Sequence, residues 1–456
     1  MEDRIMRGLS RRQLLKGAAA AAVVPIAAAC VGGSSGGGAA TPKASTSGAA
    51  AASGAAKKLS GSLSIVQWSH FVPAYDTFFD KWAKDWGTKN GVDVKVDHVA
   101  IADLPARAAS EAAAKSGHDI FGHFAQGLPA LYENSLVDIS DIADSVGKKY
   151  GGWLPAGEAI GKIDGKWRGL PDFVVPFLST WRTDIFKEAG FTKDHLETWE
   201  DLLAMAPKVK AKGKPVGTAL SNTSDAEHTW RSLMWSYGAA EFTKDGKDVA
   251  IDSAETRTVL QYAKELKGSM VDAVTSWADV DNNTNLQTGE GSWIYNPISA
   301  YRTIEKQNPD LLAKLAIDLP LRGPKAQMCS IQFTVYGIWN FSKNVDAARQ
   351  FLLDYSDNWE EEFKASAGYD NPFLNDHAKK PMPVLAADPK LVHLQDVPKY
   401  VQPIGYPGPA SKAAFDSLNT HIVADMFSQY AAGGKSLDEA IGGASKRLKE
   451  SLAKFK

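Results

Sequence analysis

The pattern of apolar and polar positions at the start of the main body predicts a strand, a helix and a second strand in succession. Residues 63–67 alternate small polar with apolar side chains, which favours a strand. Aromatic residues then recur at spacings of three and four between Tyr75 and Trp86, which predicts a helix with one aromatic face that ends near Gly91. In residues 92–96 valine alternates with aspartate and lysine, which predicts the second strand.

An alanine-rich helix over residues 102–116 and a short buried strand at 119–121 complete a βαβαβ unit. Such a unit predicts an α/β fold with a mainly parallel sheet and helices on both faces. Ligands of such sheets bind beyond the carboxyl ends of the strands. The residues directly after the predicted strands are therefore the first candidates for a site.

The middle of the chain repeats this alternation and implies a second lobe. Apolar runs predict further strands at 170–176, 178–181, 293–296 and 333–339. Helical spacing predicts helices around 185–189, 199–206, 228–238, 345–359 and 411–454. No repeat of fixed period is present.

The first 60 residues resemble an export address followed by a tether. Residues 10–16 are similar to the twin-arginine signal, with Leu14 in place of the usual phenylalanine. The alanine-rich run 18–29 is too short to span a bilayer, which needs roughly 20 residues. It ends in Ala-Ala-Ala-Cys, which resembles a bacterial lipobox, so we expect residues 1–29 to be removed and Cys30 to carry a lipid. The alternative is an ordinary signal peptide in which Cys30 is an incidental thiol.

Composition separates this tether from the body and narrows the class of function. Residues 30–60 are mostly Gly, Ser, Ala and Thr, which predicts a flexible linker with a reach of about 30 Å. The whole chain of 456 residues is 44% hydrophobic, enough to bury a large core in two or more domains. Its net charge of -2 shows no basic excess, so no nucleic-acid partner is expected. If Cys30 is lipidated, Cys329 has no partner for an intramolecular disulfide.

The motifs of common catalytic and phosphate sites are absent from the main body of the sequence. Outside the glycine- and serine-rich linker, it contains no Gly-x-Ser-x-Gly, His-Glu-x-x-His or Gly-x-x-x-x-Gly-Lys-Ser/Thr pattern. We therefore expect a protein that is not an enzyme and that uses no cofactor, no catalytic residue and no metal. With 53 acidic residues, chemistry by a pair of carboxyl groups stays open as an alternative.

Several segments, taken in order, resemble family 1 extracellular solute-binding proteins, the group that includes maltose-type periplasmic binding proteins. Residues 181–186 (Trp-Arg-Thr-Asp-Ile-Phe) are similar to a family segment ending Tyr-Asn-Lys-Asp-Leu-Phe. Residues 198–202 (Thr-Trp-Glu-Asp-Leu) resemble its Thr-Trp-Asp-Glu-Leu helix start. Residues 289–294 resemble a Gly-Lys-x-Ala-Met strand, and residues 337–352 resemble an Ile-Ser-Lys pattern that precedes a helix. The resemblance covers nearly all of residues 61–456.

The resemblance implies a two-lobed periplasmic-binding-protein fold of type II, with the ligand between the lobes and hinge closure on binding. We expect residues 61–172 and 296–335 in the first lobe and residues 173–295 and 336–456 in the second. It also implies an extracytoplasmic, lipid-anchored component of an ABC importer, monomeric, with membrane permease subunits as partners and a carbohydrate as solute. The alternatives are another polar solute, such as a polyamine, phosphate ester or peptide, and a secreted glycoside-acting enzyme.

A sugar needs polar groups for its hydroxyls and aromatic rings for its C–H faces, so we look for both at strand ends and lobe crossings. In the first lobe these residues follow strands or lie at the first crossing. They are Trp68, His70, His123, Phe124, Asp172 and Phe173. The others lie in the second lobe or where the resemblance places later contacts. They are Asn222, Trp230, Asn296, Ser299, Gln332 and Tyr369. Each of these aromatic rings has packing in the core as its alternative role.

Residues 279–290 raise one minor hypothesis, a calcium-binding loop. Oxygen-bearing side chains occupy positions 1, 3, 5, 9 and 12 of the loop template, but the glycine at position 6 is missing. The family resemblance instead predicts a helix that leads into the strand at 293–296.

Overall fold

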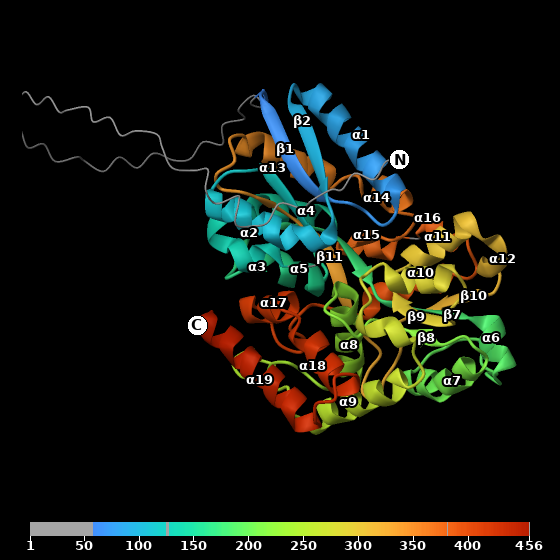
Figure 1. Ribbon diagram of the computed structural model, residues 1–456. Helices are drawn as coiled ribbons and strands as arrows, with labels where there is room; N and C mark the ends of the chain where they lie inside the picture. The colour runs from blue at the N-terminus through green and yellow to red at the C-terminus, as the bar shows by residue number, and fades with distance from the viewer. Residues whose placement is uncertain (1–57, 125–126, 381, 456) are drawn as a thin grey trace, which may run out of the picture. The chain divides into compact units, whose positions relative to one another are not determined.

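Two β-sheets organise the part of the chain that the computed structural model describes, residues 58–124, 127–380 and 382–455 (Figure 1). The expected signal peptide, the lipobox with Cys30 and most of the linker lie outside these residues. Among the described residues, every helix is too short or too polar to cross a membrane.

The first sheet runs in the order β12-β6-β11-β3-β1-β2, with β13 paired to β11. Its core, β1 between β3 and β2, is parallel, as the alternation of strands and helices predicts. The long strand β11 runs antiparallel to both β3 and β6, so the sheet is mixed rather than mainly parallel. The reason is that the chain leaves this sheet along β6 and returns to it along β11 in the opposite direction. The strands are β1 (Ser62–Trp68), β2 (Asp93–Val99), β3 (Ile120–Phe124), β6 (Leu170–Pro176), β11 (Cys329–Ile338), β12 (Asn371–Pro372) and β13 (Val401–Gln402).

The second sheet has the order β10-β7-β9-β8 and is also mixed. Strand β7 is antiparallel to both neighbours, and β8 is parallel to β9. Phe177 alone joins β6 to β7, so the chain passes from one sheet to the other within one residue. The strands are β10 (Leu315–Asp318), β7 (Leu178–Arg182), β9 (Trp293–Asn296) and β8 (Val216–Gly217); a separate hairpin pairs β4 (Lys162–Ile163) with β5 (Lys166–Trp167).

Strand pairing divides the chain differently from the expected lobe boundaries. Residues 315–318, expected in the first lobe, form β10 and pair with β7 of the second sheet. Residues 371–372, expected in the second lobe, form β12 and pair with β6 of the first sheet. Strand β11 is buried along its whole length and carries the chain back, so the helices directly after it pack on first-sheet elements.

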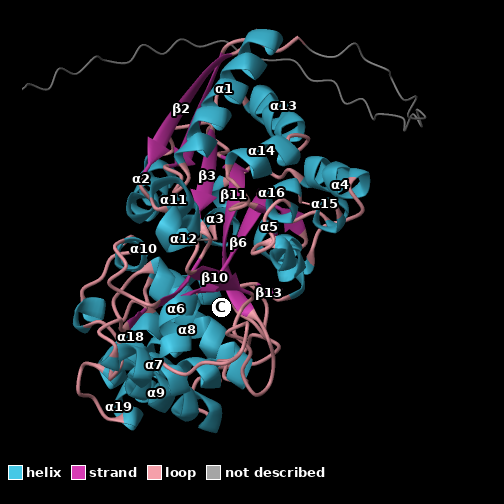
Figure 2. Ribbon diagram, turned by 90° about the vertical axis from the view of Figure 1, so that its right-hand side faces the viewer, coloured by secondary structure: helices cyan, strands magenta, loops and turns pink. Residues whose placement is uncertain are grey.

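Helices on the first-sheet side start and stop at residues suited to those positions. Helix α1 has proline at its first position and ends at Gly91, whose φ of 71° is the left-handed conformation that glycine adopts without strain. Figure 2 shows α1, α13 and α14 gathered about the β1–β3 end of this sheet. The helices of this part are α1 (Pro73–Asn90), α2 (Leu104–Ala114), α3 (Leu128–Tyr132), α4 (Ser140–Lys149), α5 (Pro155–Gly161), α13 (Val345–Tyr355), α14 (Trp359–Ala365) and α15 (Asn375–Lys379).

Helices on the second-sheet side are capped by hydroxyl side chains. The Thr198, Thr223 and Ser436 side chains each accept a backbone N–H in the first turn of α7, α8 and α19, and Glu439 completes a capping box with Ser436. The last helices, α17 to α19, return to this part and pack near α8 and α9 (Figure 1). The helices are α6 (Thr183–Glu188), α7 (Trp199–Ala211), α8 (Ser224–Tyr237), α9 (Ala254–Lys267), α10 (Asp281–Gln287), α11 (Ser299–Gln307), α12 (Pro309–Leu312), α16 (Pro383–Ala386), α17 (Lys412–Asn419), α18 (Ile422–Ala431) and α19 (Leu437–Lys454).

Candidate functional site

Four of the predicted aromatic residues gather beside the first sheet. The His70 ring lies 4.6 Å from Trp68, 5.0 Å from Tyr369 and 6.3 Å from Phe173, measured between ring centroids. Trp68 ends β1, Phe173 lies on β6, and Tyr369 comes from the loop before β12, so three separate segments build this aromatic group. All four side chains are buried.

His70 is held in one orientation and one tautomer. Its Nδ1 accepts the backbone N–H of Val72 at 2.8 Å, so the proton of the neutral ring lies on Nε2. Nε2 then donates to Asp370 Oδ1 at 3.2 Å. The second oxygen, Asp370 Oδ2, has no hydrogen-bond partner among the described residues.

Three carboxyl groups meet behind this aromatic group. Burial raises the pKa of Asp172 well above its usual value, and the nearby charge of Asp370 raises it further. Burial, with repulsion from Asp172 and Asp370, also raises the pKa of Glu362. The Asp172 and Glu362 carboxyls hydrogen-bond each other, which requires that one of them carry a proton.

A layer of neutral polar groups supports these carboxyls. Gln67 Nε2 donates to Tyr336 Oη at 2.6 Å and to Tyr75 Oη at 3.3 Å. The hydroxyls of Tyr75 and Tyr355 lie 3.1 Å apart, and Tyr355 hydrogen-bonds Glu362. Because these hydrogen bonds fix the supporting side chains, the acidic and aromatic wall is preorganised.

A second polar group lies on the second-sheet side, around the start of α8. Asp225 Oδ2 accepts from Asn282 Nδ2 at 2.7 Å, and Asp225 Oδ1 accepts from Gln332 Nε2 at 3.4 Å. Asp279 accepts the backbone N–H of Asp225 at 2.9 Å. Burial raises the pKa of Asp225 well above its usual value, and the Asp279 charge raises it further. The hydrogen bonds from Asn282 and Gln332 only partly offset this.

Asn296 and Ser299 extend this group from the end of β9 into α11. Asn282 also donates to Asn296 Oδ1 at 3.0 Å. Asn296 donates in turn to Asn283 Oδ1 at 2.5 Å and to Ser299 Oγ at 3.3 Å. These side chains form one network with Asp225, so a ligand at Asp225 would meet fixed amides and hydroxyls.

The two polar groups approach each other at Tyr369. Its pKa is raised, by burial first and then by the charges of Asp225, Asp370 and Asp279, which belong to both groups. Tyr369 Oη and Gln332 Oε1 have no hydrogen-bond partner among the described residues. Such orphaned buried atoms are costly, which makes this the place where an outside molecule has most to gain.

A small cavity of about 160 Å³ is lined by Asn222, Ser224 and Asp279 on one side and by residues 101–102 on the other. Ser224 links this cavity to the second polar group, because its hydroxyl accepts a hydrogen bond from Gln332 Nε2 at 2.9 Å. A larger groove of about 760 Å³ lies elsewhere, with Lys162, Lys412 and Phe455 in its lining. We place the candidate site at the Tyr369 region, with the smaller cavity joined to it through Ser224. The reason is that Tyr369, Gln332 and Asp370 carry unpartnered buried atoms, whereas the residues of the larger groove carry none.

The structure places one predicted residue, Trp230, away from this site and leaves His123 and Phe124 untested. Trp230 stacks on Phe427 with ring centroids 4.8 Å apart, and its N–H donates to Ala219 O at 3.0 Å, so it is a core residue of α8 and α18. His123 and Phe124 end β3, where their backbones pair with Val335 and Thr334. Their side chains lie outside the described residues.

Sequence reasoning missed most of the carboxyl groups, namely Asp225, Asp279, Glu362 and Asp370. Asp225 follows the helix cap Thr223 and resembles an ordinary first-turn acid, while Glu362 stands in the acidic run 360–362. Asp370 had one available signal, its position next to the predicted Tyr369.

The calcium hypothesis for residues 279–290 is wrong. Residues 281–287 form helix α10, whose backbone cannot wrap around an ion as a calcium loop does. Within the described part of the chain, no group of three or more His, Cys, Asp or Glu side chains is arranged to hold a metal ion.

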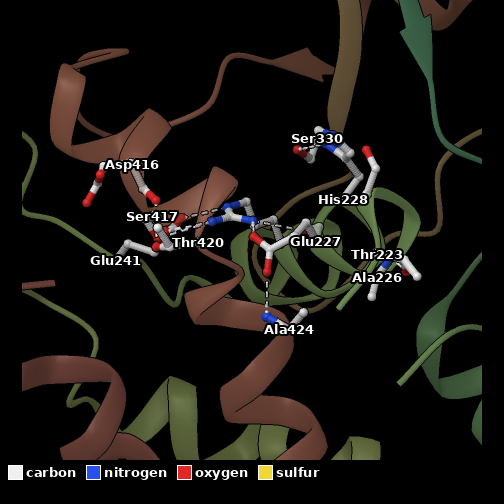
Figure 3. A network of polar contacts seen from close by, with 12 residues as sticks. Thr223, Ala226, Glu227, His228, Glu241, Ser330, Asp416, Ser417, Thr420 and Ala424 are labelled. Atoms are coloured by element: carbon white, nitrogen blue, oxygen red, sulfur yellow. Dashed lines mark hydrogen bonds and ion pairs between the residues drawn. The ribbon is translucent and has the colours of Figure 1, made fainter. Parts of the chain in front are cut away.

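A buried charged network with a built-in cation lies beside the site, at the middle of α8 (Figure 3). Arg231 donates to Glu241 at 2.8 and 2.9 Å and also pairs with Glu227. Glu227 accepts the backbone N–H of Ala424 at 2.7 Å. Burial raises the pKa of Glu227 to about 7 even though Arg231 lowers it. This network joins α8 to α18, and a single guanidinium serves both carboxyl groups.

Comparison with known proteins identifies the family to which the chain belongs. The family model described as "Bacterial extracellular solute-binding protein" matches residues 81–364. An arabinooligosaccharide-binding protein of Bacillus subtilis (strain 168) is 26% identical over 227 residues, which are 48% of this chain and 51% of that protein. A protein of the same name from Halalkalibacterium halodurans is 23% identical over 146 residues, 32% of this chain and 30% of that protein. The chain thus spans about half the length of the first relative and less of the second.

Solved structures match the fold over a greater length. Maltose-bound MalE3 of T. maritima superposes with a TM-score of 0.72 at 19% identity, covering 86% of this chain and 99% of that one. A sugar transporter from Arthrobacter chlorophenolicus A6 with bound laminaribiose gives a TM-score of 0.74 at 16% identity, with the same shares covered. At these identities the likeness shows the fold, which is the two-lobed periplasmic-binding-protein fold.

Proposed function

This chain belongs to the bacterial extracellular solute-binding protein family, and we propose that it captures a carbohydrate between its two sheets and delivers it to an ABC permease by closure of the lobes. The observation that carries the proposal is the set of buried, unpartnered polar atoms on Tyr369, Gln332 and Asp370. The ring of Tyr369 lies 6.3 Å from the ring of Trp68, measured between centroids. Hydroxyls of a sugar would satisfy the polar atoms while its C–H face packs on the rings.

The relatives support a sugar as the solute. The two curated relatives are named for arabino-oligosaccharides, and the two solved structures hold maltose and laminaribiose. A ligand that contacts both polar groups would favour the arrangement in which these groups lie close together. The difference between the ligand's affinities for the closed and the open arrangement is enough to drive closure.

The pattern of the first 60 residues supports a proposal for export and anchoring. We propose that the twin-arginine signal directs export, that Cys30 carries a lipid, and that a monomeric body samples solutes at the end of a flexible linker. Cys30→Ser should move the protein from the membrane fraction to the soluble extracytoplasmic fraction. If the variant stays in the membrane fraction, anchoring by Cys30 is wrong.

Binding without turnover is favoured over glycoside hydrolysis. The paired carboxyls Asp172 and Glu362 are in direct hydrogen-bond contact. Glycosidases hold their two carboxyls roughly 5–5.5 Å apart or more, with the scissile bond between them. Two touching carboxyls leave no room for that bond, so this pair is not arranged as the two catalytic acids of a glycosidase.

A thermal-shift screen of the purified protein against a sugar library tests the proposal. A sugar present at 100 times its dissociation constant adds about 2.7 kcal/mol to the free energy of unfolding, and the melting temperature rises accordingly. Polyamines, phosphate esters and peptides serve as the competing solute classes. Each stabilising sugar is then incubated with the protein and analysed for products. Stabilisation by a sugar without product formation supports the proposal; stabilisation only by another class, or product formation, contradicts it.

A further inference from the structure

The candidate site is acidic on both sides. Asp172, Glu362 and Asp370 belong to the first-sheet group, and Asp225 and Asp279 belong to the second-sheet group. Among the described residues, no lysine or arginine hydrogen-bonds or pairs with any of these five carboxyls. Their partners are the neutral side chains and backbone N–H groups described above.

The nearby Arg231 network shows that this imbalance is local. Glu227 lies on the same helix as Asp225, and Glu241 follows that helix; both are buried, and Arg231 pairs with both. Among the described residues, the acids of the candidate site have no lysine or arginine of this kind, and only Asp370 has a basic partner, His70 at 3.2 Å. An isolated buried carboxylate is unfavourable unless an opposite charge or a set of donors reaches it.

The unpartnered atoms indicate what the missing partner must supply. Asp370 Oδ2 and Gln332 Oε1 are acceptors, and their residues are 3% and 1% exposed. The hydroxyl of Tyr369, which is 1% exposed, lies among the carboxyls of Asp225, Asp279 and Asp370. Acceptors of this kind are satisfied by hydroxyl and ammonium donors. An ammonium beside these acids would favour their ionised form, which burial opposes, whereas a carboxylate or phosphate brings only acceptors.

On the premise of the proposed sugar-binding function, we propose that this site selects its solute by charge. It accepts neutral sugars, gains affinity from an ammonium substituent, and rejects sugars that carry a carboxylate or phosphate. The ammonium of an amino sugar would lie between Asp225 and Tyr369, where both polar groups reach it.

Matched sugars that differ only in charge test this inference by titration calorimetry. One set of probes is galactose, galactosamine and galacturonate, and a second set is glucose, glucosamine and glucuronate. The corresponding disaccharides form further sets. Within each set we expect the amino sugar to bind most tightly, the neutral sugar less tightly and the uronate least tightly. The affinities of the amino sugar and the uronate should differ at least tenfold. A uronate that binds as tightly as its neutral counterpart overturns charge selection while leaving sugar binding intact. Absence of binding by every probe overturns sugar binding itself, and charge selection with it.

Two variants separate the site from the overall charge of the protein. Asp225→Asn should lower the ratio of the affinity for the amino sugar to the affinity for the uronate at least tenfold. Asp310→Asn removes the same charge from an exposed position on α12 and should leave that ratio within about twofold. Equal effects of the two substitutions would assign the selectivity to net charge and overturn the proposal.

Discussion

The rings of Trp68 and Tyr369 lie 6.3 Å apart between centroids, with their planes inclined by 36°. One residue ends the first strand and the other follows α14, and both are buried. His70 contacts both rings and hydrogen-bonds Asp370, so it connects the aromatic group to the carboxyl groups. A solute that packs on this face therefore meets the carboxyls at the same time.

Trp68→Ala should weaken binding of the best sugar from the screen at least tenfold, because it removes the ring that a sugar face would cover. This corresponds to about 1.4 kcal/mol or more of binding free energy. Titration calorimetry measures the change. Trp153→Ala removes a half-buried ring that packs on Trp167 instead; it is the control and should bind like the wild type. Unchanged affinity in Trp68→Ala would remove this ring from the site.

The shared proton of Asp172 and Glu362 predicts a pH dependence of stability. Both pKa values are raised in the folded state, whereas in the unfolded chain these groups titrate near about 4. Their contribution to the free energy of unfolding is therefore full below about pH 4 and is lost as the pH rises through the raised values. Glu362→Gln should flatten this decline between pH 5 and 9, as measured by urea unfolding.

The neighbouring acid on the same helix provides the control for this pH dependence. The Glu361 side chain is 62% exposed and pairs only with Lys364, so Glu361→Gln should keep the wild-type slope. A Glu362→Gln variant with an unaltered slope would mean that the pair holds no shared proton.

Arg231→Met should be strongly destabilising, because it leaves Glu227 and Glu241 buried without their cation (Figure 3). Breaking a buried pair in this way costs about 3–5 kcal/mol of unfolding free energy, measurable by denaturant titration. Arg257→Met breaks exposed pairs with Asp252 and Asp438 and should change stability little. Similar effects of the two substitutions would contradict the role assigned to Arg231.

Two histidines near Asp318 should respond to pH in opposite directions. The hydrogen bond from His195 to Asp318, 2.6 Å long, raises the pKa of His195, whereas burial lowers the pKa of His393. The stability from His195 is present below about pH 6.5 and is lost as the pH rises through its raised pKa. The stability from His393 is present above about pH 6.5 and is lost as the pH falls.

Thermal unfolding between pH 5 and 8 tests this pair of predictions. His195→Gln should reduce stability most at acidic pH, and His393→Gln should do so most at neutral pH. Identical pH profiles of the two variants would contradict the assignment.

Local pattern was enough to predict most elements of the fold. The spacing of aromatic residues in α1, with Pro73 and Gly91 at its ends, and the valine alternation of β2 each carry their own signal. The direction of β11 could not be predicted, because it depends on pairing with β3 and β6, which lie far away in the sequence. The lobe boundaries after residue 296 depend on the same pairing.

The candidate site was partly predictable for a similar reason. The positions of strand ends predicted Trp68 and His70, and the family resemblance predicted Asp172, Phe173 and Tyr369. The structure brings these five residues together. Trp230 was an error of the same reasoning: α8 is buried along nearly its whole length, so an aromatic residue on it needs no ligand. Asp225 and Asp279 were missed because only the folded chain places them opposite Tyr369.

The crystal structure of the protein with the best-binding sugar from the screen tests the central claim most directly. The account predicts sugar density bounded by Trp68 and Tyr369 on one side and by Asp225 and Gln332 on the other, with hydroxyls on the polar atoms that now have no partner. Density in the groove lined by Lys162, Lys412 and Phe455 instead, with the Tyr369 region unchanged, would contradict it.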